Sequence, residues 1–381
     1  MIRRDFAAAV NIVWCVCLWG AVGIAQAADV IDASLARVDD EKKLAWYDLQ
    51  LLDIEGRAFS ETTSPYDRLP ANAEGVVRDA VWKLSRHSAG LCARFVTNAT
   101  SIQAKWTLTS TRLAMPHMAA TGVSGLDLYV KTERGQWRWL ATGSPTEQEN
   151  SKVLVRSVPV GKREYMLYLP LYNGVSEVEI GIPSDATLAK AQSHVHKPIV
   201  FYGTSITHGA CASRPGMVHT AILGRRLGYP VVNLGFSGNG RMEAEVAKLM
   251  SEIDASVYVI DCLPNIRAEE VTQRTEPLVR ILRDAHPETP ILLVEDRSYA
   301  DSFLIESKRL RNEQSRAALR AVLERLNDAG EKNVYYLEGE HLLGSDGEGT
   351  VDSSHPTDLG FLRQADAFEE VLRPVLGLSN K

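Results

Sequence analysis

The second half of the chain alternates short apolar stretches with longer amphipathic ones, and this alternation constrains the fold more than any other feature. The apolar stretches have the composition of buried strands and lie at 198–202, 231–234, 256–261, 291–294 and 334–337. Helical patterns follow them, at 217–227, 242–251, 269–285, 307–329 and 359–372. Buried strands separated by helices are typical of a parallel, doubly wound α/β sheet, which binds ligands at the carboxyl ends of its strands.

The first half of the chain has the pattern of an all-β domain. Apolar and polar residues alternate in stretches at 91–96, 101–108, 126–130, 165–169 and 175–182. Turn residues such as Asn98, Gly135 and Asn173 separate these stretches, and no long helical pattern occurs among them. Short alternating strands with regular turns favour an antiparallel β-sandwich. We therefore expect a β-sandwich domain over 28–195 and the α/β domain over 196–381.

Residues 1–27 have the features of a secretory signal peptide. Arg3 and Arg4 form a basic start, residues 7–24 carry no charge, and the small residues Ala25 and Ala27 suit a cleavage site. The alternative is an uncleaved membrane anchor, because the apolar run approaches the ~20 residues that span a bilayer. The pattern favours cleavage after Ala27. We expect a secreted or periplasmic protein with no stable membrane insertion of the mature chain.

Composition excludes several classes of protein. Hydrophobic residues make up 45% and charged residues 24% of the chain, a globular balance that excludes a disordered or fibrous protein. The 42 Lys and Arg against 48 Asp and Glu give a net charge of -6, and no basic run occurs. We therefore expect no nucleic-acid partner. The expected partner is a small-molecule or glycan substrate.

Candidate catalytic side chains come just after the predicted strands. Ser205 follows the first strand, a glycine-rich turn with Gly238 follows the second, and Asn265 follows the third. Gly238 and Asn265 have a structural alternative as turn or cap residues, and the Gly-x-Ser pattern at Ser205 also occurs by chance in many chains. Near the C-terminus, Asp352 and His355 have the spacing Asp-x-x-His. This spacing either lets the carboxylate fix the imidazole tautomer or belongs to a surface cap. A serine beside a histidine held in this way is an activated nucleophile.

In this chain order, the four groups resemble the blocks of the SGNH/GDSL hydrolase superfamily, whose parallel sheet is flavodoxin-like. The resemblance implies that Ser205 is the nucleophile, His355 the general base and Asp352 the acid that orients it. It also implies an oxyanion hole formed by the backbone N–H groups of Ser205 and Gly238 and by the side chain of Asn265. The first block reads Gly-Thr-Ser in place of Gly-Asp-Ser, and the third has Pro-Asn without the common Gly-x-Asn-Asp form. These departures concern substrate more than chemistry.

A second resemblance concerns the sandwich domain. Residues 125–129 read Gly-Leu-Asp-Leu-Tyr and are similar to the Gly-x-Asp-Leu-Tyr signature of a domain that precedes one GDSL-type subgroup. The stretches 201–207, 211–217 and 261–265 also resemble that subgroup. The resemblance implies ester hydrolysis, often of acetyl groups on carbohydrates, although some such proteins are acyltransferases. Asp127 and Tyr129 either contact substrate or only stabilise their strand.

Four further side chains have competing interpretations. His208, which stands where the subgroup has Gln, lies one helical turn beyond Ser205 and either contacts substrate or packs as a polar neighbour. Arg214 either binds substrate or holds its own loop. His194 and His196 form a His-x-His pair without a matching Cys or acidic partner, so we expect no metal site. The proposed chemistry also implies no organic cofactor.

Cysteine usage does not indicate a disulfide framework. Of the 5 cysteines, Cys92, Cys211 and Cys262 follow the predicted signal peptide, too few to staple a domain of this size. Cys211 follows the first predicted α/β strand by a short loop, and Cys262 ends the third. These two either form one bridge or remain buried thiols.

Together these features predict an exported serine esterase that hydrolyses acetyl or other short acyl esters, with a carbohydrate as the expected substrate. Two alternatives stay open. The first is an acyltransferase that uses the same site to pass the acyl group to another hydroxyl. The second is a carbohydrate-binding protein whose hydrolase fold is inactive. The complete set of Ser205, Asn265, Asp352 and His355 favours an active enzyme over the last of these.

Overall fold

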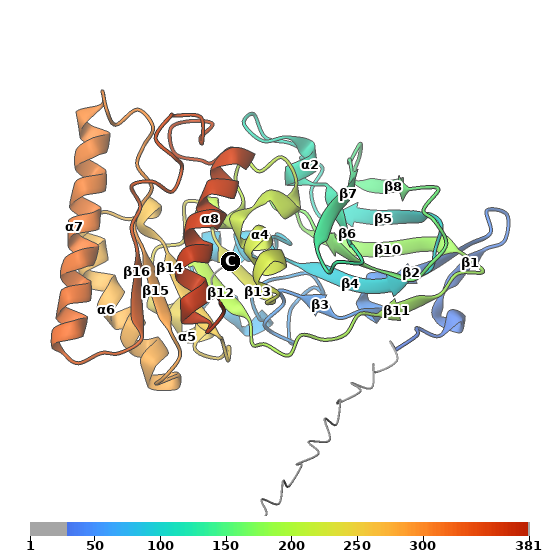
Figure 1. Cartoon of the computed structure of the whole chain (residues 1–381), viewed down its shortest axis with the longest axis horizontal. Coiled ribbons are helices and arrows are strands. Elements are labelled where there is room, and N and C mark those ends of the chain that lie inside the picture. Colours follow the sequence, from blue (N-terminus) through green and yellow to red (C-terminus); the bar gives the residue numbers. More distant parts are fainter. Residues whose placement is uncertain (1–28, 380–381) are drawn as a thin grey trace, which may run out of the picture.

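The computed structural model describes residues 29–379 and divides them between two kinds of sheet (Figure 1). The first part holds two antiparallel sheets packed face to face, and the second holds a parallel sheet flanked by helices. The predicted fold class is therefore confirmed. The predicted signal peptide lies outside the described residues.

The two antiparallel sheets form the sandwich. The first sheet has, in spatial order, the strands β1 (Arg37–Asp39), β2 (Leu44–Asp48), β10 (Val175–Pro183), β5 (Ile102–Leu108) and β8 (Glu149–Val155). The second has β11 (Leu188–Lys190), β4 (Cys92–Thr97), β9 (Arg163–Tyr168), β6 (Leu126–Lys131) and β7 (Trp137–Gly143), and β3 (Ile54–Glu55) also pairs with β4. In β5 every second residue is buried, because successive side chains of a strand point to opposite faces. The alternation of apolar and polar residues in this strand therefore predicts correctly which side chains face the interior of the sandwich.

The parallel sheet contains the five strands predicted from the apolar stretches. Their spatial order is β13 (Val231–Gly235), β12 (Ile199–Gly203), β14 (Val257–Asp261), β15 (Ile291–Val294) and β16 (Val334–Leu337). This is the 2-1-3-4-5 order of flavodoxin-like sheets. Since β12 pairs with both β13 and β14 in parallel, the carboxyl ends of the first three strands meet at one edge.

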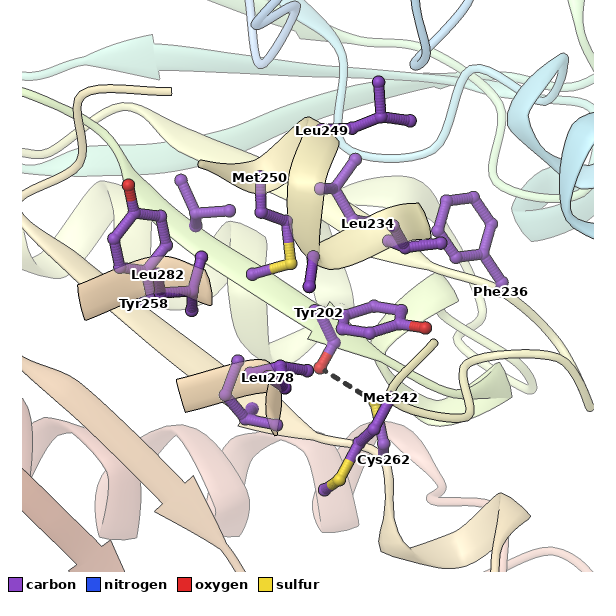
Figure 2. Close-up of a cluster of buried hydrophobic side chains, with 14 of the residues drawn as sticks. Tyr202, Leu234, Phe236, Met242, Leu249, Met250, Tyr258, Cys262, Leu278 and Leu282 are labelled. Carbon is purple, nitrogen blue, oxygen red and sulfur yellow. Dashed lines mark hydrogen bonds between the residues drawn. The ribbon is translucent and has the colours of Figure 1, made fainter. Parts of the chain in front are cut away.

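Helices cover both faces of the parallel sheet (Figure 1). On one face lie α4 (His219–Leu227) and α8 (Asp358–Val375), which share a core with Ile199 and Phe201. On the other lie α5 (Ala244–Met250), α6 (Ala268–Ala285) and α7 (Glu306–Asp328), which share a core with Val200 and Tyr202. Figure 2 shows part of this second core, where side chains from α5 and α6 surround Tyr202 and Tyr258.

A segment of the first half packs on the second, which the sequence pattern does not indicate. Residues 59–82, which include most of the short helix α1 (Asp79–Ser85), connect strands of the sandwich in sequence. Yet Phe59, Val77 and Trp82 belong to the same buried cluster as Leu234 of the parallel sheet and Val246 of α5. The two halves are therefore joined by a shared hydrophobic core.

Element boundaries differ from the predicted ones by a few residues. Helix α5 begins at Ala244 and not at 242, because Met242 has a left-handed φ of 56° that no helix continues through. Within residues 29–379, no helix combines the length and the apolar character needed to cross a bilayer.

Candidate active site

Ser205 lies where the central strand β12 turns into a helix. The strand ends at Gly203, and Thr204 caps the one-turn helix α3 (Ser205–His208) by accepting from the N–H of Ile206 at 3.3 Å. A Cβ at Gly203 would collide with the side chain of Thr207, so the turn requires glycine there. The nucleophile candidate therefore begins a helix at the carboxyl edge of the sheet, where a helix N-terminus favours developing negative charge.

Ser205, His355 and Asp352 form a hydrogen-bonded chain. The Oγ of Ser205 lies 2.8 Å from Nε2 of His355. The Nδ1 of the same ring lies 2.7 Å from Oδ2 of Asp352. The other carboxylate oxygen accepts from the backbone N–H of His355 at 2.8 Å. The predicted residues thus come together from two segments that are distant in sequence.

The electrostatics of Asp352 suit an orienting carboxylate. Partial burial raises the pKa of this carboxyl, but hydrogen bonds from the backbone and ring of His355 outweigh that effect and hold the pKa below its usual value. An ionised Asp352 accepts a hydrogen bond from the Nδ1–H of His355, and this tautomer leaves Nε2 free to accept a proton from Ser205.

Two loops beside Ser205 carry the predicted oxyanion donors. Gly238 is exposed and has a φ of 68°, within a turn where Gly240 N–H donates to the Phe236 carbonyl at 2.8 Å. Asn265 ends the 3-10 turn after β14, and its Nδ2 donates to the Gly240 carbonyl at 3.2 Å. The amide of Asn265 therefore ties the third block to the second, and both lie at the same edge of the sheet as Ser205.

Two arginines from the 56–90 region hold the Gly238 loop, and sequence reasoning missed both. Arg68 is buried and donates to the carbonyl of Asn233 at 2.9 Å and to that of Gly235 at 2.8 Å. Arg78 donates to Oδ1 of Asn239 at 2.8 Å. No local signal marks them, because a lone arginine in a loop usually indicates a solvated surface.

His208 lies in the domain junction. Its side chain is fully buried, its Nε2 lies 2.7 Å from the Leu171 carbonyl oxygen, and its ring stacks on Tyr172 with centroids 4.2 Å apart. Burial, with the nearby charge of Arg68 adding to it, lowers the pKa of His208 well below its ordinary value. This placement corresponds to the packing alternative, because a fully buried ring has no surface for a substrate.

Arg214 joins the α/β domain to the Gly-x-Asp-Leu-Tyr signature of the sandwich. Its Nη1 donates to Oδ2 of Asp127 at 2.7 Å and also to the hydroxyl of Tyr129. The same Asp127 oxygen accepts the Gly216 N–H at 2.9 Å, and Oδ1 accepts the Trp139 indole N–H at 3.0 Å. Both signature residues therefore hold the 211–217 loop that follows Ser205 in sequence, which corresponds to the loop-holding interpretation of Arg214.

Two further residues border the site without having been predicted. The Tyr172 hydroxyl donates to the Ser205 carbonyl at 3.2 Å. His117, from a loop of the sandwich, has its ring centroid 6.1 Å from that of His355. The sandwich domain therefore contributes directly to the surroundings of the catalytic candidates.

The cysteines do not form the predicted bridge, and of the two thiols Cys262 is buried and Cys211 half-buried. Cys211 and Cys262 are both free. The Sγ of Cys262 donates to the Tyr202 carbonyl at 3.5 Å within the core shown in Figure 2. Cys211 lies in the loop after α3, where burial, with Asp352 adding to it, raises the pKa of the thiol to about 12. A thiol with so high a pKa is protonated and unreactive at neutral pH.

Family models match both halves of the chain. The GDSL-like lipase/acylhydrolase family matches residues 196–373, and the N-terminal GxDLY domain of SGNH-hydrolase-type esterases matches residues 44–188. A protein assigned as a GDSL-like lipase from Bacteroides ovatus is 36% identical, with 89% of this chain and 99% of that chain covered and a TM-score of 0.85. This chain belongs to the GDSL-like lipase/acylhydrolase family.

More distant structures share the fold of this GDSL-like hydrolase. A salicylyl-acyltransferase from a tetracycline biosynthetic pathway is 20% identical, with a TM-score of 0.67 over 92% of this chain and 98% of that one. An active-site mutant of a family two carbohydrate esterase from Clostridium thermocellum is 16% identical, with a TM-score of 0.59 over 76% of this chain and 93% of that one. No curated protein matches the chain. These two likenesses show a shared fold, and the family is that of GDSL-like lipases and acylhydrolases.

Proposed function

We propose that this GDSL-like hydrolase is an exported serine esterase that removes acetyl or other short acyl groups from a carbohydrate. The observation that carries the proposal is the hydrogen-bonded chain from Ser205 through His355 to Asp352, with links of 2.8 and 2.7 Å. This is the arrangement that activates a serine hydroxyl for attack on an ester carbonyl.

The reaction proceeds through an acyl-enzyme. Ser205 Oγ attacks the carbonyl carbon while Nε2 of His355 takes the hydroxyl proton. The carbonyl oxygen becomes an oxyanion, which the N–H groups of Ser205 and Gly238 and the amide of Asn265 stabilise. As the C–O bond to the alcohol breaks, the imidazolium gives its proton to the alcohol oxygen, and the acyl group stays on Ser205.

Water completes the cycle. His355 takes a proton from a water molecule, whose oxygen attacks the acyl-enzyme carbonyl. The second tetrahedral intermediate collapses, the bond to Ser205 Oγ breaks, and the imidazolium returns the proton to that oxygen. The carboxylic acid leaves, and no redox or metal step is needed to balance the reaction.

The proposed substrate class and the proposed export of the protein rest on two separate observations. We propose carbohydrate because the proteins of similar fold include a family two carbohydrate esterase. We propose export because residues 1–27 have the pattern of a signal peptide. N-terminal sequencing of the exported protein should begin at Ala28, and a sequence beginning at Met1 would reject cleavage.

Acetate release from 4-nitrophenyl acetate and from a panel of acetylated glycans tests the activity. Ser205→Ala should lower turnover at least ~1000-fold while leaving the fold intact, and activity within tenfold of wild type would reject the assignment. Added alcohol separates the alternatives. A hydrolase releases acetic acid, an acyltransferase forms the ester of the added alcohol, and an inactive binding protein does neither.

A further inference from the structure

A rigid turn of the sandwich domain carries His117. The backbone N–H of Met115 donates to the carbonyl of Met118, and the N–H of Met118 donates back to the carbonyl of Met115, both at 3.0 Å. Pro116 and His117 occupy the two central positions, and proline there pre-sets the backbone of a tight turn. His117 itself is exposed, so its imidazole projects from a fixed backbone.

The turn is also fixed against the hydrolase domain. Met118 is buried in the cluster that contains Ile206 of α3 and Val218 before α4. The short helix α2 (Ala120–Val123) begins two residues after Met118. In this helix, Oγ1 of Thr121 donates to the Ser213 carbonyl at 2.6 Å. These contacts hold the His117 ring near the catalytic candidates, and its centroid lies 6.1 Å from that of His355.

The chemistry of the proposed reaction assigns a part of the substrate to this position. The imidazolium of His355 protonates the departing alcohol oxygen, so that oxygen must come within hydrogen-bond reach of Nε2. The alcohol portion of the ester therefore lies on the His355 side of Ser205, and the oxyanion lies toward Gly238 and Asn265. A side chain adjoining His355 faces the alcohol portion.

We infer that His117 forms a subsite for the alcohol portion of the ester and that this subsite selects a polyhydroxylated alcohol, such as a sugar. A neutral imidazole offers one N–H donor and one acceptor nitrogen, which pair with the hydroxyl groups beside an esterified position. The inference rests on the proposed esterase function. It makes the sandwich domain a contributor to substrate selection.

The test compares two acetyl esters that differ in their alcohol portion. Wild type, His117→Ala and His117→Gln are assayed on 4-nitrophenyl acetate and on an O-acetylated methyl xyloside. We expect His117→Ala to lower kcat/KM for the sugar ester about tenfold more than for the aryl ester, the effect of losing a hydrogen bond to a sugar hydroxyl. His117→Gln, which keeps a donor and an acceptor, should recover part of that difference.

His196→Ala provides a matched control. His196 is also exposed, and its ring stacks on Tyr229, which precedes β13 and so lies at the opposite end of that strand from the site. This variant should leave both rates unchanged, and thermal unfolding should show that each variant is folded.

The outcomes separate the inference from the function on which it rests. If wild type hydrolyses both esters and His117→Ala lowers the two rates equally or not at all, the inference is wrong and the esterase function stands. If wild type hydrolyses only the aryl ester, the alcohol is not a sugar and the inference is again wrong. If wild type hydrolyses neither while remaining folded, the proposed function fails and the inference fails with it.

Discussion

Asp127 of the sandwich domain lies 2.7 Å from Arg214 of the hydrolase domain, measured from Oδ2 to Nη1. The carboxylate is fully buried, and it also accepts the Gly216 N–H and the Trp139 indole N–H. Burial raises the pKa of Asp127, although the charge of Arg214 lowers it in part. The signature aspartate is thus a structural link across the domain junction.

Replacing Asp127 with Ala should destabilise the protein by about 3 kcal/mol, because it leaves the Arg214 guanidinium without its carboxylate in a largely buried position. Arg37→Ala is the control, since its 2.7 Å ion pair with Glu179 is more exposed and should be worth less than about 1 kcal/mol. Urea unfolding measures the free energy of unfolding of both variants. Equal losses for the two variants would show that Asp127 does not hold the junction.

Asp352→Asn should lower kcat by about 1000- to 10 000-fold with little change in stability. The asparagine oxygen can still accept the backbone N–H groups of Ser354 and His355, which Oδ1 of Asp352 now accepts at 3.1 and 2.8 Å. The substitution removes only the carboxylate charge that accepts the hydrogen bond from Nδ1–H of His355. Steady-state kinetics on 4-nitrophenyl acetate measure the effect.

Asp346→Asn is the control for that experiment. Asp346 lies in a nearby loop and pairs with Arg363 through two 2.7 Å contacts, so its replacement removes a similar charge without touching the imidazole. It should leave kcat unchanged. If Asp352→Asn keeps kcat within tenfold of wild type, some other group orients His355.

Asn265→Ala should lower kcat about 100- to 1000-fold and change KM little, because its amide is proposed to meet charge that develops only in the transition state. Asn265→Asp keeps the size of the side chain but places a negative charge beside the oxyanion, so its loss should be at least as large. An unchanged kcat in the alanine variant would assign Asn265 only a structural role, through its contacts with the Gly240 and Phe236 carbonyls at 3.2 and 3.5 Å.

The sequence predicts those parts of the molecule that depend on local pattern. Strand β12 is a run of buried apolar residues, so its position follows from composition alone. The spacing of Asp352 and His355 likewise places both on one loop, where their contact is 2.7 Å. Parallel sheet geometry then brings the ends of neighbouring strands together, which is why the residues after three strands could be assembled into one site.

The remainder depends on contacts that no local pattern records. Arg68 reaches carbonyls 165 and 167 residues away in sequence, and His117 reaches the site from a sandwich loop. The pattern of apolar and polar residues around Arg68 and around His117 does not indicate these long-range contacts. The packing of residues 59–82 on α5 has the same origin, since apolar residues such as Phe59 and Trp82 indicate burial but not the partner.

The burial of His219 should make the folded protein less stable as the pH decreases. Its ring packs among Phe201, Phe361 and Phe368, and neither ring nitrogen has a hydrogen-bond partner within residues 29–379. Burial, with the charge of Arg297 adding to it, lowers the pKa of His219 well below its ordinary value. The unfolded chain therefore binds a proton below pH ~6.5 that the folded chain does not.

Stability is consequently lost as pH falls, by up to about 1.4 kcal/mol per pH unit for this proton. His219→Phe keeps an aromatic ring and removes the titration, so its stability relative to wild type should grow as the pH is lowered from 7 to 5. Two other histidines should leave a residual slope in the variant: half-buried His87, whose pKa burial lowers to about 4, and buried His208, whose pKa also lies well below its ordinary value. Urea unfolding across this pH range measures the difference, and a constant difference at every pH would mean that His219 titrates alike in the folded and unfolded chains.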